Sequence, residues 1–228
     1  MEIRWIESKF FDPYKIANEM IIVHHTGSKN GRINSLQGVI DWFKPNPWRD
    51  RNKVSAQYVV PRYEHYIVQM VRDEHTAYHA GASSWRINGV TRTNLNNRSI
   101  GIELIGDGNL IEYTPFQYEA LIWLTRKKME EFNIPLELVQ GHEHVSPGRK
   151  VDPGRLFDWK YFRKEITPAS RVVVPEPIPI PPSPQPPPTP GEEYHVDRFV
   201  EEENVTMPSG ENPPLLERLF DLIISIFK

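Results

Sequence analysis

The 228-residue sequence contains no cysteine. Disulfide bonds and thiolate-ligated metal sites are therefore excluded, and any metal ion must be held by histidine and carboxylate side chains. The first eleven residues, MEIRWIESKFF, do not combine a basic start with an apolar run, so they do not indicate a secretory signal peptide.

A surplus of one sign of charge is also lacking, because 27 Lys and Arg stand against 30 Asp and Glu. The acidic excess lies in residues 171–228, whereas residues 1–170 are slightly basic. No cluster of Lys and Arg is interleaved with aromatic residues, which excludes nucleic acid as an expected partner. With 39% hydrophobic and 25% charged residues, the composition is that of a soluble globular protein.

Proline is abundant in one place only. Ten of the sixteen residues from Pro175 to Pro190 are proline, a composition typical of an extended polyproline II spacer. We therefore expect a folded domain at 1–170, a proline-rich linker at 171–191 and an acidic tail at 192–228. The last sixteen residues, 213–228, predict an amphipathic helix that contacts a membrane interface or a partner surface; packing on the folded domain is the alternative.

Within residues 1–170, short apolar runs alternate with helical patterns. The runs MIIVHHT (20–26) and SIGIELIG (99–106) predict strands, and AQYVV and HYIVQMV predict a hairpin around the turn at 61–64. The patterns at 35–43 and 114–132 predict helices, the second capped by Thr114 and Pro115. This interleaving favours an α/β fold, with a central mainly mixed β-sheet flanked by helices.

Three segments carry residues suited to chemistry: VHHT (23–26), GHEH (141–144) and PGRKVDPG (147–154). Together they offer two histidines and a carboxylate. Catalytic zinc takes three such protein ligands and keeps a fourth position for water or substrate. Because more than a hundred residues separate the first segment from the others, the spacing alone is a weak signal.

Six segments of the sequence stand out together: IIVHHT, VSAQYVV, RDEHTAYHAG, NNRSIGIELIG, TPFQYEAL and GHEHVSPGRKVDPGRLFDW. In their order and spacing, over about residues 18–165, the sequence resembles the amidase-2 family, whose members include N-acetylmuramoyl-L-alanine amidases of bacterial peptidoglycan. The resemblance implies a hydrolase with one Zn²⁺ held by His24, His142 and Asp152, the last at a position where other branches carry Cys.

The resemblance also implies roles around the metal. Glu103 lies in an apolar strand, where a carboxylate either forms an ion pair across the sheet or has a function, and here it matches a general base. Lys150 matches a lysine that approaches the developing oxyanion. Four further residues are expected to bind substrate: His79, Trp85, Asn97 and Arg149.

Two features refine this interpretation. Ala56 stands where amidase-type phage lysozymes carry a catalytic tyrosine, so that residue is not carried over and the recycling-type branch is the more similar one. His25 and His144 are interpreted as neighbours of the site rather than ligands, with His144 a candidate for orienting a ligand.

Peptidoglycan is the expected partner, and a lytic endolysin is the expected role, since a spacer and tail suit an enzyme that acts on an extended wall. We expect synthesis in the host cytoplasm and action at the cell wall. Three alternatives remain open: a cell-wall recycling amidase, an autolytic amidase, and a peptidoglycan-binding protein without catalysis.

Overall fold

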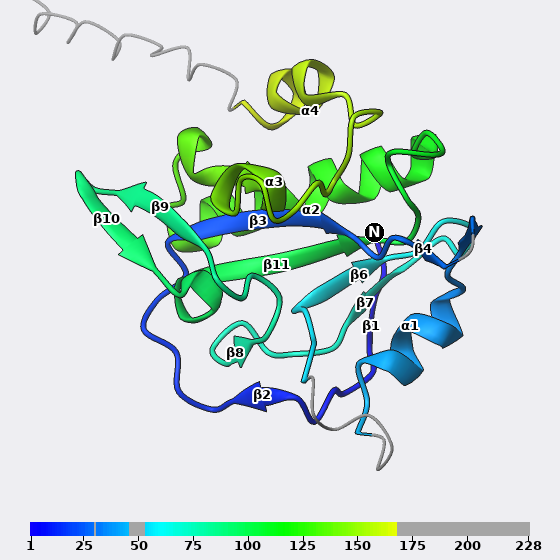
Figure 1. The fold of residues 1–228 in the computed structure, drawn as a ribbon, viewed down its shortest axis with the longest axis horizontal. Coiled ribbons are helices and arrows are strands. Elements are labelled where there is room, and N and C mark those ends of the chain that lie inside the picture. The colour runs from blue at the N-terminus through cyan, green and yellow to red at the C-terminus, as the bar shows by residue number, and fades with distance from the viewer. Residues whose placement is uncertain (30, 46–52, 168–228) are drawn as a thin grey trace, which may run out of the picture. The chain divides into compact units, whose positions relative to one another are not determined.

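The computed structural model describes residues 1–29, 31–45 and 53–167 (Figure 1). The expected linker at 171–191, the tail at 192–228 and the helix at 213–228 lie outside the described residues. Within the described ranges, no helix has the length and apolar character needed to cross a membrane.

A central six-stranded sheet has the order β1-β7-β6-β11-β3-β12. Strands β6, β11, β3 and β12 are mutually parallel, whereas β7 runs antiparallel to β6 and parallel to β1. The expected mixed sheet and the β6–β7 hairpin are therefore confirmed. Figure 1 shows β3 and β11 side by side within the sheet. The strands are β1 (Ile3–Trp5), β7 (Ile67–Gln69), β6 (Tyr58–Val60), β11 (Ser99–Leu104), β3 (Met20–His25) and β12 (Val139–Gly141).

Short elements surround this sheet. Two 3₁₀ helices, η1 (Leu95–Arg98) and η2 (Leu136–Leu138), precede β11 and β12 directly. Three small antiparallel pairs lie among the connections: β2 (Phe11–Asp12) with β8 (Thr76–Ala77), β9 (Ser84–Ile87) with β10 (Val90–Thr93), and β4 (Ser28–Lys29) with β5 (Arg32–Ile33).

The helices begin where the sequence places capping residues. At the start of α2 (Pro115–Phe132), the Thr114 hydroxyl accepts a hydrogen bond from the Gln117 backbone N–H, and the Gln117 side chain accepts one from the Thr114 N–H. Ser35 caps α1 (Leu36–Trp42) by accepting from the backbone N–H of Gly38. The remaining α-helices are α3 (His142–Val145) and α4 (Trp159–Ile166).

Both faces of the sheet are covered. Tyr58 and Val60 of β6 belong to a core that contains the buried side of α2 and part of α4, whereas Val59, between them, packs in a second core with α1. Burial on both faces explains why the parallel strands are almost continuously apolar.

Side chains along β11 point alternately to the two faces of the sheet, and this alternation positions Glu103. Ile100, Ile102 and Leu104 join the core that includes α2, so the intervening Ser99, Gly101 and Glu103 point to the opposite face. Glu103 pairs in register with His24 of β3, and the two side chains emerge together near the carboxyl ends of their strands. In open α/β sheets this edge is where ligands commonly bind.

Candidate metal centre

Three side chains predicted as ligands meet at the carboxyl edge of the sheet. His24 Nδ1 lies 2.9 Å from His142 Nδ1, and each of these nitrogens lies 3.0 Å from Asp152 Oδ2. All three residues are buried, and their ligand atoms form a group that could hold a metal ion. Two imidazole nitrogens and one carboxylate oxygen form a donor set typical of a catalytic zinc site.

Strand order brings the first two ligands together. His24 is near the end of β3, and β12 pairs beside β3 with Gly141 opposite Val23. His142 is the next residue, so it emerges beside His24 although 118 residues separate them. Asp152 arrives on a loop whose backbone oxygen at residue 152 accepts a hydrogen bond from the Glu143 N–H.

The hydrogen bonds of His142 favour a cation at this point. Its Nε2 lies 3.0 Å from the carbonyl oxygen of Ala80, which can only accept, so Nε2 carries a hydrogen and donates it. The guanidinium of Arg149 is 3.3 Å from the same nitrogen, but it has closer acceptors at 2.8 Å in the carbonyl oxygens of Ala80 and Ala82. With Nε2 engaged by Ala80, Nδ1 is the nitrogen that faces Asp152 and that would bind a metal ion.

The ionisation states agree with metal binding. Burial lowers the pKa of His24 to about 4, so its imidazole is neutral and able to ligate. Burial alone would raise the pKa of Asp152, but its interactions with His142 and His24 hold that pKa below the ordinary value. The carboxylate is therefore charged, as a metal ligand must be.

Glu103 is the candidate for the general base. Burial, reinforced by the charge of Asp152, raises the pKa of Glu103 to about 8, while the charge of Lys150 opposes the rise. Its Oε2 is buried and has no hydrogen-bond partner among the described residues. An ion pair across the sheet, the structural alternative for this residue, does not form among the described residues, so the carboxylate is available for a ligand.

A cleft of about 560 Å³ opens beside the centre. Its lining includes Lys150, Arg149, His142 and His79, so the structure brings four of the predicted site residues to one cavity. Lys150 is half-buried, and its charge lowers the pKa values of both His24 and Glu103. A cation is therefore directed toward the region where the metal centre and the cleft meet.

The other three residues expected to bind substrate do not all line this cleft with a free side chain. Trp85 of β9 lines a separate cavity of about 450 Å³ and packs on the main core. Asn97 does not line the cleft beside the metal centre; its neighbour Asn96 does. Arg149 lines that cleft, yet its guanidinium is held by the carbonyl oxygens of Ala80 and Ala82. Contact of these residues with substrate stays a prediction.

The two histidines interpreted as neighbours of the site are not in the ligand group. His25 Nδ1 accepts a hydrogen bond from the Gly108 N–H at 3.0 Å, on the loop that packs against the Asp152 segment. His144 Nδ1 accepts from the Gly141 N–H at 3.1 Å, and its ring packs on Trp159. His144 therefore stabilises the start of α3, the helix that carries His142.

The sequence did not reveal the residues that hold the Asp152 loop. Tyr113 donates its hydroxyl hydrogen to the Pro153 carbonyl oxygen at 2.6 Å. Gly108 and Gly154 touch, and a Cβ on Gly108 would lie only 2.0 Å from that carbonyl oxygen. Gly154 also has a φ of +97°, which favours glycine. The GRKVDPG motif contained a signal for Gly154, whereas no local pattern marked Gly108 or Tyr113.

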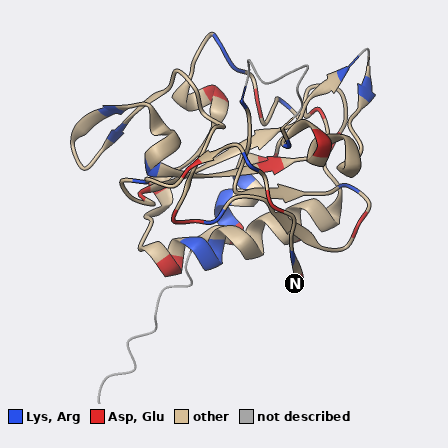
Figure 2. Cartoon of the chain, turned by 90° about the horizontal axis from the view of Figure 1, so that it is seen from below, with Lys and Arg blue, Asp and Glu red and all other residues tan. Residues whose placement is uncertain are grey.

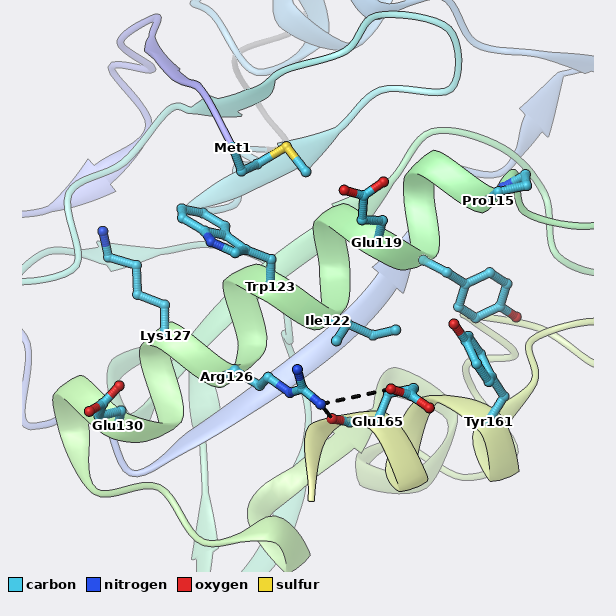
Figure 3. A pocket seen from close by; sticks show the side chains of 11 residues that line it. Met1, Pro115, Glu119, Ile122, Trp123, Arg126, Lys127, Glu130, Tyr161 and Glu165 are labelled. Atoms are coloured by element: carbon cyan, nitrogen blue, oxygen red, sulfur yellow. Dashed lines mark hydrogen bonds and ion pairs between the residues drawn. The ribbon is translucent and has the colours of Figure 1, made fainter. Parts of the chain in front are cut away.

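A larger cavity of about 770 Å³ lies elsewhere, between α2 and α4 (Figure 3). Its lining residues include Trp123, Ile122 and Tyr161, with an ion pair between Arg126 and Glu165. It contains none of the three metal-ligand candidates, so cavity size does not locate the site. Among the described residues, basic and acidic segments are interspersed rather than segregated on one face (Figure 2).

Comparisons with known proteins agree with this geometry. A family model described as N-acetylmuramoyl-L-alanine amidase matches residues 14–155. The 1,6-anhydro-N-acetylmuramyl-L-alanine amidase AmpD of Citrobacter freundii is 39% identical over 118 residues, or 52% of this chain and 60% of that protein. The chain thus spans less than two thirds of the length of this relative.

Two solved structures show the same fold. A crystal structure of an AmpD derivative superposes with a TM-score of 0.63 and 29% identity, over 73% of this chain and 95% of that one. The amidase AmiD from E. coli, solved with the substrate anhydro-N-acetylmuramic acid-L-Ala-D-γ-Glu-L-Lys, has a TM-score of 0.54 and 29% identity, over 66% and 58% of the two chains.

The fold and site define an α/β protein with a buried His-His-Asp group able to hold a metal ion beside an unpartnered carboxylate. With the family model matching more than half of its residues, the chain belongs to the N-acetylmuramoyl-L-alanine amidase family.

Proposed function

We propose that the protein is a zinc-dependent N-acetylmuramoyl-L-alanine amidase that hydrolyses the amide between N-acetylmuramic acid and L-alanine in peptidoglycan. The observation that carries this proposal is the triangle of buried ligand atoms on His24, His142 and Asp152, with the unpartnered Glu103 carboxylate on the adjacent strand. A structural histidine cluster would not need a second, unpaired carboxylate beside it.

The substrate class is inferred from the relatives. AmiD, at 29% identity, was solved with an anhydro-N-acetylmuramoyl peptide, and AmpDh3 of Pseudomonas aeruginosa, at 25% identity, with an anhydromuramic pentapeptide. Polar residues suited to such a ligand line the cleft beside the metal centre, among them Lys150 and Asn96. A peptidoglycan stem peptide attached to its sugar is therefore the ligand we propose.

The residues divide the reaction between them. Zinc, when bound by the three ligands, would polarise the lactyl carbonyl and make a water molecule more acidic. In its ionised form, Glu103 takes a proton from the attacking water and delivers it to the nitrogen of L-alanine as the carbon–nitrogen bond breaks. Lys150 stabilises the oxygen that becomes negative on the former carbonyl. The products are the muramic acid carboxylate and a peptide with a free amino group.

Removal of the metal is the first test. Chelation should abolish amide hydrolysis and lower the melting temperature, because a ligand bound only by the folded state stabilises that state. Zinc should restore both, and mass spectrometry of digested walls should show new L-alanine amino termini. Full activity in protein that assays metal-free would contradict the zinc-dependent mechanism, and a different new terminus would contradict the bond assignment.

For the biological role, we propose a lytic endolysin, made in the host cytoplasm and acting at the cell wall. The proline-rich composition of 171–191 and the acidic tail at 192–228 support it, because a tethered second contact suits an extended substrate. The AmpD relative, named for a 1,6-anhydro substrate, favours the recycling alternative. The predicted helix at 213–228 would serve the lytic role by contacting a membrane interface or a partner.

Substrate preference should separate these roles. A lytic enzyme should digest cross-linked walls at a rate comparable to soluble anhydro-muropeptides, and deletion of 191–228 should reduce lysis of intact cells more than digestion of purified walls. Turbidity clearing and chromatography of released peptides measure the two activities. Strong preference for the soluble fragment, with no effect of the deletion on lysis, would instead indicate recycling.

A further inference from the structure

One loop contacts both histidines of the metal centre at Nε2, the ring nitrogen that does not face the other ligands. His24 Nε2 lies 2.9 Å from His79 Nδ1, and His142 Nε2 lies 3.0 Å from the carbonyl oxygen of Ala80, the next residue. We propose that His79 is a positioning residue, which accepts a hydrogen bond from His24 and so directs the lone pair of His24 Nδ1 toward the metal. This inference rests on the proposed zinc site and assigns His79 a role other than substrate binding.

The direction of the hydrogen bond follows from Ser99. Its single hydroxyl hydrogen is donated to the Leu95 carbonyl oxygen at 2.6 Å, so Ser99 Oγ can only accept from His79 Nε2 at 3.3 Å. His79 Nε2 therefore carries a hydrogen. Because the proposed metal site leaves His24 Nδ1 without a hydrogen, the ring hydrogen of His24 is on Nε2, 2.9 Å from His79 Nδ1, which must accept it.

The resulting relay has one direction throughout. His24 donates from Nε2 to His79, His79 donates from Nε2 to Ser99, and Ser99 donates to the carbonyl oxygen of Leu95 in η1. Each group uses its one hydrogen once. His24 Nδ1 is then the nitrogen without a proton, the form that binds a metal.

The His79 ring is held where it is. Only 7% of the residue is exposed, and its ring occupies the space where a side chain on Gly101 would be, since a Cβ there would lie 2.5 Å from His79 Cγ. The side-chain oxygen of Asn96 accepts hydrogen bonds from the backbone N–H groups of His79 and Ala80, at 3.0 and 2.6 Å. One amide side chain thus fixes the segment that contacts both histidine ligands.

Metal binding requires a free lone pair on His24 Nδ1, and the hydrogen bond to His79 favours it. The Asp152 carboxylate lies 3.0 Å from His24 Nδ1 and favours the tautomer with the ring hydrogen on that nitrogen. A metal ion needs the other tautomer. By accepting at Nε2, His79 favours the tautomer that leaves the Nδ1 lone pair for the metal, and so raises metal affinity. Loss of such an outer hydrogen bond typically weakens metal binding by about 10–100-fold.

Substitution of His79 tests the relay through zinc affinity, measured by competition with a chromophoric chelator. His79→Leu removes the acceptor and should weaken zinc binding about 10–100-fold. His79→Asn places an amide oxygen where Nδ1 lies and should recover most of the loss. Ser99→Ala, a smaller change, removes only the acceptor of His79 and should weaken binding less. His65→Leu, an exposed histidine packed on Phe116, is the control for the same substitution elsewhere.

Nitrogen-15 NMR of the zinc-loaded full chain provides the second readout. The His79 signals, assigned by their loss in His79→Asn, should show the proton on Nε2. A proton on His79 Nδ1 overturns the proposal. So does a His79→Leu protein that binds zinc as wild type but has a raised KM, because that result indicates substrate binding. The zinc competition and the NMR measurement do not require amidase activity, so a failure of the proposed reaction would be seen separately; only the KM comparison does.

Discussion

Replacement of Glu103 by glutamine should lower kcat by about 10²–10⁴-fold while the bound zinc stays at one equivalent. The variant keeps the size and burial of the side chain but cannot take a proton from the attacking water. Digestion of purified walls gives the rate, and elemental analysis gives the zinc content. Near wild-type turnover in a zinc-loaded Glu103→Gln protein would show that another group is the base.

The same variant should be more stable than wild type when both are metal-free. The pKa of Glu103 rises from an ordinary 4.5 to about 8 in the folded protein. Between these values the unfolded chain releases the proton and the folded protein keeps it, so stability falls as pH rises. Glutamine removes this cost. The metal-free variant should therefore melt above wild type at pH 8 and show no such gain at pH 4.

This pair of results separates function from structure. A carboxylate kept for an ion pair would, when neutralised, destabilise the protein and leave turnover nearly intact. A matched control is Glu137→Gln in η2, an acidic residue outside the site, which should change neither turnover nor the pH dependence of melting. Loss of stability in Glu103→Gln at pH 8 would favour the structural interpretation.

The elements that carry the site were predictable from local patterns. The apolar runs that end at His24 and surround Glu103 formed β3 and β11, and the Thr114 cap formed the start of α2. Strand periodicity alone could not show that β12 would lie beside β3 and bring His142 to His24. That neighbourhood depends on packing between segments far apart in the chain, which has no local signature.

The contacts that the His79–Ala80 loop makes with the histidine ligands and with Asn96 could not be predicted from the sequence either, because they depend on local backbone geometry. Asn97 was one of the residues expected to bind substrate; in η1 it is the neighbouring Asn96 whose side chain reaches the His79–Ala80 loop. One residue along a 3₁₀ helix turns a side chain by about a third of a turn, so a small difference in backbone decides which asparagine faces the site. His79 was predicted by resemblance to bind substrate, and it does line the cleft; that prediction did not include its contacts with His24 and Ser99.

Replacement of the Asp152 carboxylate should have the largest effect on metal binding. Asp152→Asn removes the one negative ligand, leaving two neutral imidazoles, and zinc should no longer be retained through dialysis. Activity should fall to the background of the metal-free protein. Asp152→Cys offers a thiolate at the same position and should retain zinc, because thiolate is an established ligand at distances of about 2.3 Å. Zinc content and wall digestion of the two variants provide the comparison.

The two variants together test whether the negative charge of the ligand matters, rather than the conformation of the loop that carries residue 152. Both keep the residue between Val151 and Pro153, so the contacts of the Pro153 carbonyl oxygen with Tyr113 remain possible in each. If the loop alone mattered, asparagine and cysteine would behave alike. If the anionic ligand matters, zinc binding should follow charge: strong with aspartate, retained with the cysteine thiolate and lost with asparagine. Tight zinc binding by Asp152→Asn would remove Asp152 from the ligand set and require a different third donor.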